Sequence, residues 1–487
     1  MSSGRTTFGS QAAQTSLSGL VRRNASAGRK RRTLRPRNPR SRKPRNNPIS
    51  KISLAAVAVR RWAAVRRRFR RCLPFPFSRE HVVMTDEEIA AWAKDPRRAD
   101  TLPFGLFEPA YRKGITGAAL VVRGVLYFRN GYTPTVRKAL VQCFEQYAAM
   151  VDEYHHALEV AAGQKPSKEG PLRWFYTEGK QPMAYEKAPA FERLATSTPG
   201  DTSLVATMTS ADHKLATGFY EFSVFALGEW KATHNRGLDT LVFTVPRAFL
   251  EQRPGKFQAL FVAMCEALSI VHGHAGYGVN LPPMELNANE ASEYFYARRY
   301  GPGIDVGDPM GYSTVMLEGA IKTVDWIVAL DANLVRAAGG ADSLTLPPDW
   351  YVRQPLGDGG LIVQAGVAPQ ASVSAGPGKP PLPPPAYVLL DAALRPIIAE
   401  KMDILQSGTL DSTAPLLNTT IATEAWLKRF VLQPDQVTEQ WRELHKTPTV
   451  GSSKSAVAAN LSRFRKAMGL PGPVPSNGFG YDGGLPG

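Results

Sequence analysis

Two histidines, His272 and His274, are separated by a single residue, so on a strand their side chains would lie on one face. Imidazoles arranged in this way can ligate zinc or another transition metal. A zinc site needs at least a third side chain, and the sequence places no third ligand beside this pair. We therefore predict no metal site and no bound cofactor, and we interpret both histidines as ordinary strand or turn residues.

The cysteines also argue against catalysis. The chain has three of them, Cys72, Cys143 and Cys265, without the close spacing of a zinc site. Cys265 could pair with His272 as a nucleophile, but Cys143 and Cys265 both lie on the apolar stripe of a predicted helix, where burial disfavours a thiolate. Disulfides are not expected either, which is typical of the reducing cytoplasm where we place the protein.

No sequence motif of a known catalytic site is present. The segment GPGIDVGDPMG (residues 301–311) is rich in glycine, but no predicted strand leads into it and no Lys-Ser or Lys-Thr follows, so it is not a phosphate-binding loop. A nucleophile elbow, a zinc-protease helix and the kinase motifs are also missing. The residues thus indicate a binding protein and not an enzyme.

The elements that would position these residues alternate between strands and helices. Leu120–Phe128 is β-branched and apolar, which predicts a strand, and Thr133 and Pro134 are suited to begin a helix. Apolar residues then recur at helical spacing, namely Val136, Leu140, Cys143, Phe144, Tyr147 and Val151. Strands at 219–227 and 239–245, a helix over 257–268 and a strand over 274–281 follow. This pattern predicts an α+β fold, a mixed or antiparallel sheet with helices packed on one face.

The later part of the body is expected to alternate strand-like pieces with Gly-Gly and Asp-Gly turns, over 321–340 and 358–369. We place the whole body at residues 84–400, with a proline-rich insertion at 370–386. Short C-terminal helices are predicted over 401–470, and a disordered Gly/Pro-rich tail over 471–487. No apolar run approaches the roughly 18 residues of a membrane span.

Charge separates an N-terminal arm from the body. Residues 1–83 hold 22 Lys and Arg and one acid, Glu80, which leaves 37 bases and 41 acids in residues 84–487. The formal charge of +17 and the basic isoelectric point therefore describe the arm, because the body carries a net charge of −4. A self-repelling, apolar-poor segment of this kind is expected to be disordered.

Four interpretations of the arm remain open. It could bind nucleic acid through counterion release, or it could be a secretion signal or a transit peptide. Alternatively, residues 1–83 are upstream sequence, and translation begins at Met84. We favour the last of these, because Thr85 and Glu88 form a capping box directly after Met84.

Three segments resemble a known family. They are ARRYGPGIDVGDP (Ala297–Pro309), IKTVDWIVALDANLVRAAGG (Ile321–Gly340) and GGLIVQAGVAP (Gly359–Pro369). Their order and spacing resemble the type VI secretion immunity family, whose members protect bacteria against nuclease effectors, including those of the VRR-Nuc type. The resemblance covers about residues 105–400.

The resemblance has local departures, and its motif is mostly structural. Asp325 replaces the asparagine that precedes the tryptophan in the family, and Ala338 replaces a leucine before the two glycines. The resemblance implies roles in holding the fold for Trp326, Gly339, Gly340, Gln364 and Gly366.

The function that the resemblance implies is neutralisation of a cognate effector toxin, most simply a basic nuclease, by a protein that covers its active site or nucleic-acid groove. Four carboxylates lie in a Gly-, Asn- and Tyr-rich segment expected to be a loop, and we predict that they bind the toxin: Glu290, Glu293, Asp305 and Asp308. Solvated surface acids are the alternative for these four. A nucleic-acid-associated protein that uses its arm is the alternative for the whole chain.

Overall fold

The computed structural model describes residues 91–92, 94, 98, 100–235, 237–312, 317–373 and 381–431. The predicted arm (1–83), the predicted tail (471–487) and the helices predicted beyond residue 431 lie outside the described residues. Among the described helices, none is long and apolar enough to cross a membrane.

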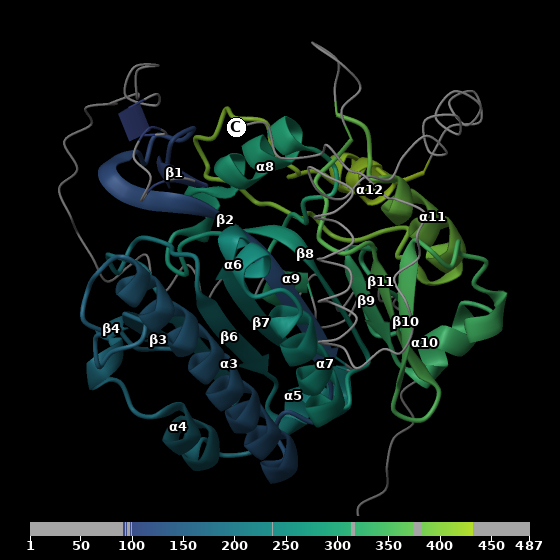
Figure 1. The fold of residues 1–487 in the computed structure, drawn as a ribbon, viewed down its shortest axis with the longest axis horizontal. Coiled ribbons are helices and arrows are strands. Elements are labelled where there is room, and N and C mark those ends of the chain that lie inside the picture. Colours follow the sequence, from purple (N-terminus) through teal and green to yellow (C-terminus); the bar gives the residue numbers. More distant parts are fainter. Residues whose placement is uncertain are drawn as a thin grey trace, which may run out of the picture. The chain divides into compact units, whose positions relative to one another are not determined.

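The described strands form an antiparallel sheet in the order β10-β11-β9-β8-β2-β7-β6-β5-β3-β4, with β1 paired to β2 (Figure 1). The strands are β1 (Thr101–Phe104), β2 (Arg112–Phe128), β3 (Trp174–Thr177), β4 (Met183–Ala184), β5 (Leu204–Thr209), β6 (Glu221–Ala226), β7 (Asp239–Pro246), β8 (His272–Asn280), β9 (Ile327–Leu330), β10 (Tyr351–Leu356) and β11 (Gly360–Ala365). The predicted α+β fold and its antiparallel sheet are confirmed.

The described helices vary widely in length. They are α3 (Pro134–Ala161), α4 (Phe191–Ser197), α5 (Glu229–Asn235), α6 (Arg247–Gln252), α7 (Lys256–Leu268), α8 (Glu290–Tyr300), α9 (Pro309–Tyr312), α10 (Ala332–Ala337), α11 (Pro385–Leu394) and α12 (Thr420–Leu427). Short 3-10 segments occur at Tyr185–Lys187, Leu286–Ala288, Ala341–Ser343 and Arg395–Ile397.

Helices α3 and α7 lie side by side across one face of the central strands (Figure 1). Helix α3 begins as predicted, because the Thr133 hydroxyl accepts a hydrogen bond from the Val136 amide. Phe243 of β7 lies with its ring centroid 5.2 Å from that of Phe257 and 6.3 Å from that of Tyr147, which joins both helices to the sheet. This layer is apolar, as the helical spacing of its residues predicted.

Both described cysteines lie in this apolar layer. Cys143 of α3 and Cys265 of α7 are buried and free, and burial raises the pKa of both thiols. A buried thiol with a raised pKa is a poor nucleophile.

The opposite face of β2 and β8 contacts the described parts of residues 301–326, an irregular stretch with little secondary structure. The register pairs Tyr127 with His272 and Val125 with His274, so these four side chains share that face. The Tyr127 hydroxyl donates to the carbonyl of Pro309, 3.4 Å away. Polar contacts of this kind act together with buried apolar side chains of the stretch, such as Val306, Leu317 and Ile321, which belong to the main core.

Some predicted elements differ from the observed ones. Within 321–340 only Ile327–Leu330 is a strand, and α10 follows because the Asp331 carboxylate accepts from the Leu334 amide as an N-cap. Helix α8 occupies a segment that was predicted to be a loop. Its sequence carried the signals of a helix: acids in the first turn, arginines in the last turn and a terminating glycine, Gly301, with φ of +126°.

The predicted boundaries at 370–386 and 400 do not coincide with breaks in packing. Gln370 and Ala371 are buried, and α11 begins at Pro385. Beyond residue 400, Met402, Trp426 and Phe430 belong to the main apolar core. The described residues 401–431 therefore pack with the body.

Candidate partner-binding site around helix α8

Three of the four carboxylates predicted to bind a toxin point inward. Glu290 and Glu293 of α8 are 4% and 2% exposed, and Asp305 is 2% exposed. The prediction that they lie on an exposed loop is wrong, because each is held by internal hydrogen bonds or ion pairs. Asp308 is half-buried, and its carboxylate accepts from the Met310 amide at 3.0 Å.

Glu290 and Glu293 fasten the chain near residue 407 to α8. The Glu290 carboxylate accepts from the amides of Ser407 and Gly408. The Glu293 carboxylate accepts from the Gln406 amide group at 2.7 Å and from the backbone of Gly307 at 3.0 Å. Burial raises the pKa of Glu293 to about 7, although Arg123 and these hydrogen bonds oppose the rise.

Asp305 is the centre of what we term the buried charge network: Arg123, His274, Asp305 and Lys322. Its carboxylate lies 2.6 Å from Lys322 Nζ, 2.9 Å from Arg123 Nη2 and 3.2 Å from His274 Nε2. Burial alone would raise the pKa of Asp305, but Lys322, His274 and Arg123 together hold it well below its usual value. Burial lowers the pKa of Lys322 to about 8, against the opposing effect of Asp305.

The network joins distant parts of the chain. Arg123 comes from β2 and His274 from β8, whereas Asp305 and Lys322 belong to the irregular stretch on top of them. Sequence reasoning missed Arg123 and Lys322, although a lone arginine within an otherwise apolar strand signals a buried pair. The arrangement joins the described parts of residues 301–326 to the two central strands β2 and β8.

Asp325 adds a second acid below this network. Its carboxylate accepts from the Trp326 amide at 2.7 Å, and it occupies the space that a side chain at Gly276 would fill. Burial, and then the charge of Asp305, raise the pKa of Asp325 to about 8. The group is therefore largely protonated at neutral pH.

The two histidines do not form a metal site with neighbours in the described chain, where no group of three potential ligands occurs. His272 Nε2 lies 3.0 Å from the carbonyl of Leu317, to which it can donate, and His274 faces Asp305. Burial lowers the pKa of both imidazoles, that of His272 to about 3. They are buried partners of the irregular stretch.

Three of the residues assigned to the structural motif, Trp326, Gln364 and Gly366, meet at the end of β11. The Trp326 indole donates to the Gly366 carbonyl at 3.2 Å, and Gln364 donates to the same oxygen at 2.7 Å. Trp326 is fully buried and stacks on Phe257 of α7, with ring centroids 6.2 Å apart. Gly339 and Gly340 end α10 with φ of +99° and +94°. These contacts suit the structural roles that we propose for them.

The outward side of α8 has a different composition. Arg298 and Arg299 are exposed, and Tyr294 and Phe295 are half-buried. The Phe295 ring lies 5.2 Å from that of Phe107, which is 37% exposed. The inward side of α8 thus holds two acids beside Ala291 and Tyr296, and the exposed residues at its C-terminal end are arginines.

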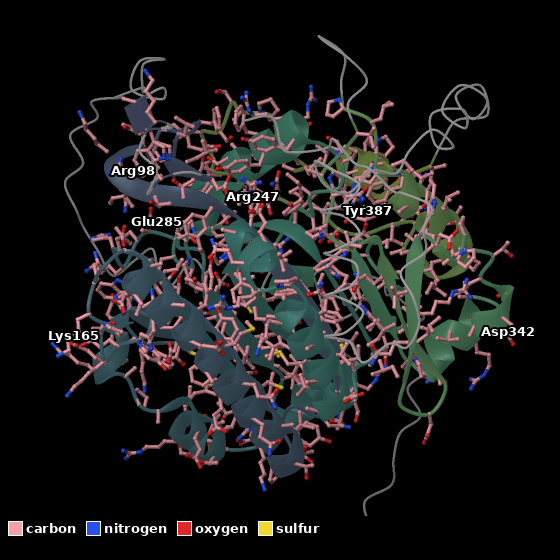
Figure 2. All side chains as sticks on the ribbon, viewed as in Figure 1. Arg98, Lys165, Arg247, Glu285, Asp342 and Tyr387 are labelled. Atoms are coloured by element: carbon pink, nitrogen blue, oxygen red, sulfur yellow. The ribbon has the colours of Figure 1, made fainter. Side chains whose placement is uncertain are left out.

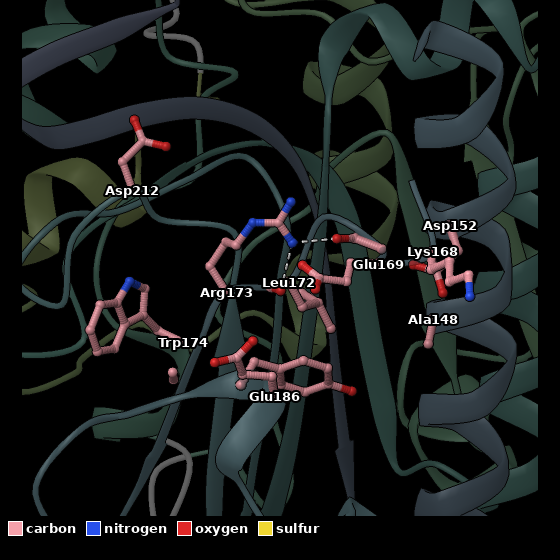
Figure 3. Close-up of a pocket in the computed structure, with 12 residues that line it drawn as sticks. Ala148, Asp152, Lys168, Glu169, Leu172, Arg173, Trp174, Glu186 and Asp212 are labelled. Atoms are coloured by element: carbon pink, nitrogen blue, oxygen red, sulfur yellow. Dashed lines mark hydrogen bonds between the residues drawn. The ribbon is translucent and has the colours of Figure 1, made fainter. Parts of the chain in front are cut away.

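An open pocket of about 610 Å³ lies elsewhere, between α3 and the chain around β3 and β4 (Figure 3). Its wall carries four acids and two bases, Asp152, Glu169, Glu186, Asp212, Lys168 and Arg173. The Arg173 guanidinium donates to the carbonyls of Gly170 and Leu172. Trp174 and Tyr185 add apolar surface to this wall. Because the wall carries charges of both signs, it does not indicate one class of ligand.

The chain matches a known protein family and a solved structure. Residues 139–430 match the family model described as type VI immunity for VRR-NUC. The structure is similar to that of the Pseudomonas aeruginosa T6SS protein PA0821, with a TM-score of 0.63 and 28% sequence identity. This similarity covers 74% of the present chain and 96% of the Pseudomonas chain. No curated protein sequence matches the chain. The family match extends to residue 430 and so includes α12, beyond the limit near 400 that the sequence motifs indicated.

Proposed function

The chain belongs to the family of type VI immunity proteins for VRR-NUC, and we propose that it binds one VRR-Nuc effector and covers its active site. The family match over residues 139–430 carries this proposal. That range holds most of the sheet, the irregular stretch over it and α8. The similarity to a Pseudomonas T6SS protein over nearly all of that protein supports the same assignment.

Neutralisation by occlusion requires a stable complex and no chemistry by this chain. An apolar centre would supply most of the affinity, and complementary charges would set the rate of encounter and the discrimination between effectors. The net charge of −4 on residues 84–487 suits a partner with a basic nucleic-acid groove. We place the encounter in the cytoplasm and infer that the chain is not an enzyme.

Co-expression tests the proposal. A VRR-Nuc effector, sought first among the genes beside this one, is expressed in a susceptible bacterium, alone and with the full chain. We expect growth arrest and DNA degradation with the effector alone, and rescue with the full chain. A non-cognate nuclease toxin is the control, and the chain should not rescue it. Growth arrest that persists despite soluble expression of both proteins would contradict the function.

The charge of the arm favours a second candidate, association with nucleic acid. The 22 bases in residues 1–83 would bind phosphates with an affinity that falls steeply as salt rises. A chain that begins at Met84 separates the two functions. We expect it to rescue growth like the full chain and to have lost any salt-sensitive DNA binding. Loss of rescue on this truncation would make the arm part of the immunity function.

A further inference from the structure

We propose that the outward side of α8 and its two neighbouring segments form the surface that docks on the effector, with Arg298 and Arg299 directed at carboxylates of its nuclease centre. We term this surface the α8 face: Phe107, Tyr294, Phe295, Arg298, Arg299 and Leu410. The inference rests on the proposed function and names the surface and the partner chemistry that carry it out.

The α8 face has the composition of a binding hot spot. Aromatic residues and arginines dominate the binding energy of protein interfaces, because they offer large rigid contact areas and several donors. Leu410 is 92% exposed and Phe107 is 37% exposed. Exposed apolar side chains that lie together in one patch mark interaction sites more often than single ones do.

The interior of α8 keeps this surface in place. Glu290 and Glu293 hold residues 406–408 against the helix. Glu108 accepts from the hydroxyls of Thr409 and Ser412, which fixes the segment of Leu410 next to that of Phe107. In Figure 1 the chain after α11 passes beside α8 near the start of β2. A surface that is already ordered loses less entropy on binding than a mobile loop does.

The arginines are available to a partner. No carboxylate in the described part of the chain pairs with Arg298 or Arg299. Arg298 lies over the Tyr294 ring, with Cζ 5.8 Å from its centroid, and donates to the Tyr294 hydroxyl at 3.4 Å. By contrast, the nearby Arg112 forms an ion pair with Glu285 at 2.8 Å, so its charge is already paired within the protein.

The chemistry of a nuclease centre suits such a surface. Metal-dependent phosphodiester cleavage uses carboxylates that hold divalent ions. A guanidinium binds a carboxylate with two parallel hydrogen bonds, which a lysine cannot do. Arginines seated there, with apolar contacts around them that exclude water, would occupy the place of the metals and of the scissile phosphate.

The test measures binding of the purified effector to the full chain in EDTA, which removes divalent ions from carboxylates that hold them. Three variants are compared with the wild type: R298E/R299E, L410D and K165E/K180E. The last is the control, with two exposed lysines after α3 and after β3, and Lys165 lies well apart from Glu285 and α8 (Figure 2). Unchanged melting temperatures establish that each variant is folded.

We expect R298E/R299E to weaken binding by at least about 100-fold, because two charge pairs become repulsive. L410D should weaken it by roughly 10-fold, and K165E/K180E by less than about twofold. Wild-type affinity in R298E/R299E would overturn the inference while leaving the proposed function intact. No binding by the wild type would overturn the proposed function itself. Binding of bare duplex DNA by the wild type that R298E/R299E abolishes would also overturn the inference, in favour of a nucleic-acid surface.

Discussion

The two faces of the central strands are covered in different ways. On one face, α3 and α7 pack aromatic and aliphatic side chains such as Tyr147 and Phe257 onto Phe243. On the other face, the described parts of residues 301–326 lie on β2 and β8 through the buried charge network and His272. The apolar face needs only a periodic pattern, whereas the charged face depends on the identity of a few residues. The second face also adjoins α8, through Glu293 and Gly307.

Replacement of Trp326 should have the largest effect on the free energy of unfolding. The residue ends the stretch 301–326 and packs on α7, so it links the coverings of the two faces. The indole is fully buried, stacks on Phe257 and donates to Gly366. We expect Trp326→Ala to lower the free energy of unfolding by about 3–5 kcal/mol, measured by chemical denaturation. A variant that keeps its stability but no longer binds the effector would make Trp326 a partner contact.

Asp305→Ala should cost a similar amount, about 3–5 kcal/mol, on the charged face. It leaves Lys322 and Arg123 as buried charges without their carboxylate. Asp342→Ala is the control, because Asp342 is an exposed acid, and it should cost less than about 1 kcal/mol. Equal effects of the two replacements would mean that the charge network does not hold the irregular stretch.

The apolar face could be predicted from the sequence because helical spacing and a β-branched run each report burial directly. Thr133 as an N-cap and the stripe from Val136 to Val151 were identified in this way. The charged face could not, because one-dimensional patterns do not show that Arg123 and Asp305, far apart in the chain, meet in space. Acids between glycines are typical of exposed loops, so Glu290, Glu293 and Asp305 were placed outside.

Helix α8 is a second case in which the sequence does not reveal that charged side chains are buried. Its buried side includes Glu290 and Glu293 beside Tyr296, so the usual rule for amphipathic helices places the two acids on the wrong face. The terminal signals at Glu290, Arg299 and Gly301 would have identified the helix. They would not have shown that Gln406 and residues 407–408 satisfy its inward carboxylates, since that depends on tertiary contacts.

Glu290→Gln should weaken the attachment of residues 407–408 to α8. The amides of Ser407 and Gly408 would donate to a neutral oxygen in place of a carboxylate, and we expect a loss of about 1–3 kcal/mol in unfolding free energy. Glu285→Gln is the control, because its pair with Arg112 is exposed and should contribute less than about 1 kcal/mol. Comparable losses would contradict the anchoring role of α8's inner side.

Asp325→Asn should stabilise the protein by a small amount that depends on pH. The pKa of Asp325 is raised from 3.8 to about 8, so between these values the folded chain must hold a proton that the unfolded chain has lost. Stability therefore falls as pH rises from about 4 to 8. An asparagine side-chain oxygen can still accept from the Trp326 amide. We expect almost no gain at pH 4 and the largest gain at pH 8. A gain that is independent of pH would show that Asp325 is not protonated in the fold.

Hydrogen–deuterium exchange of the free and effector-bound protein compares the two regions in one measurement and tests the docking surface most directly. We expect added protection on complex formation at residues 104–111, in α8 and at 404–412, and no change in α3 or around β3 and β4. Protection confined to α3 and the pocket beside it, with α8 unchanged, would contradict the proposal that the α8 face binds the effector.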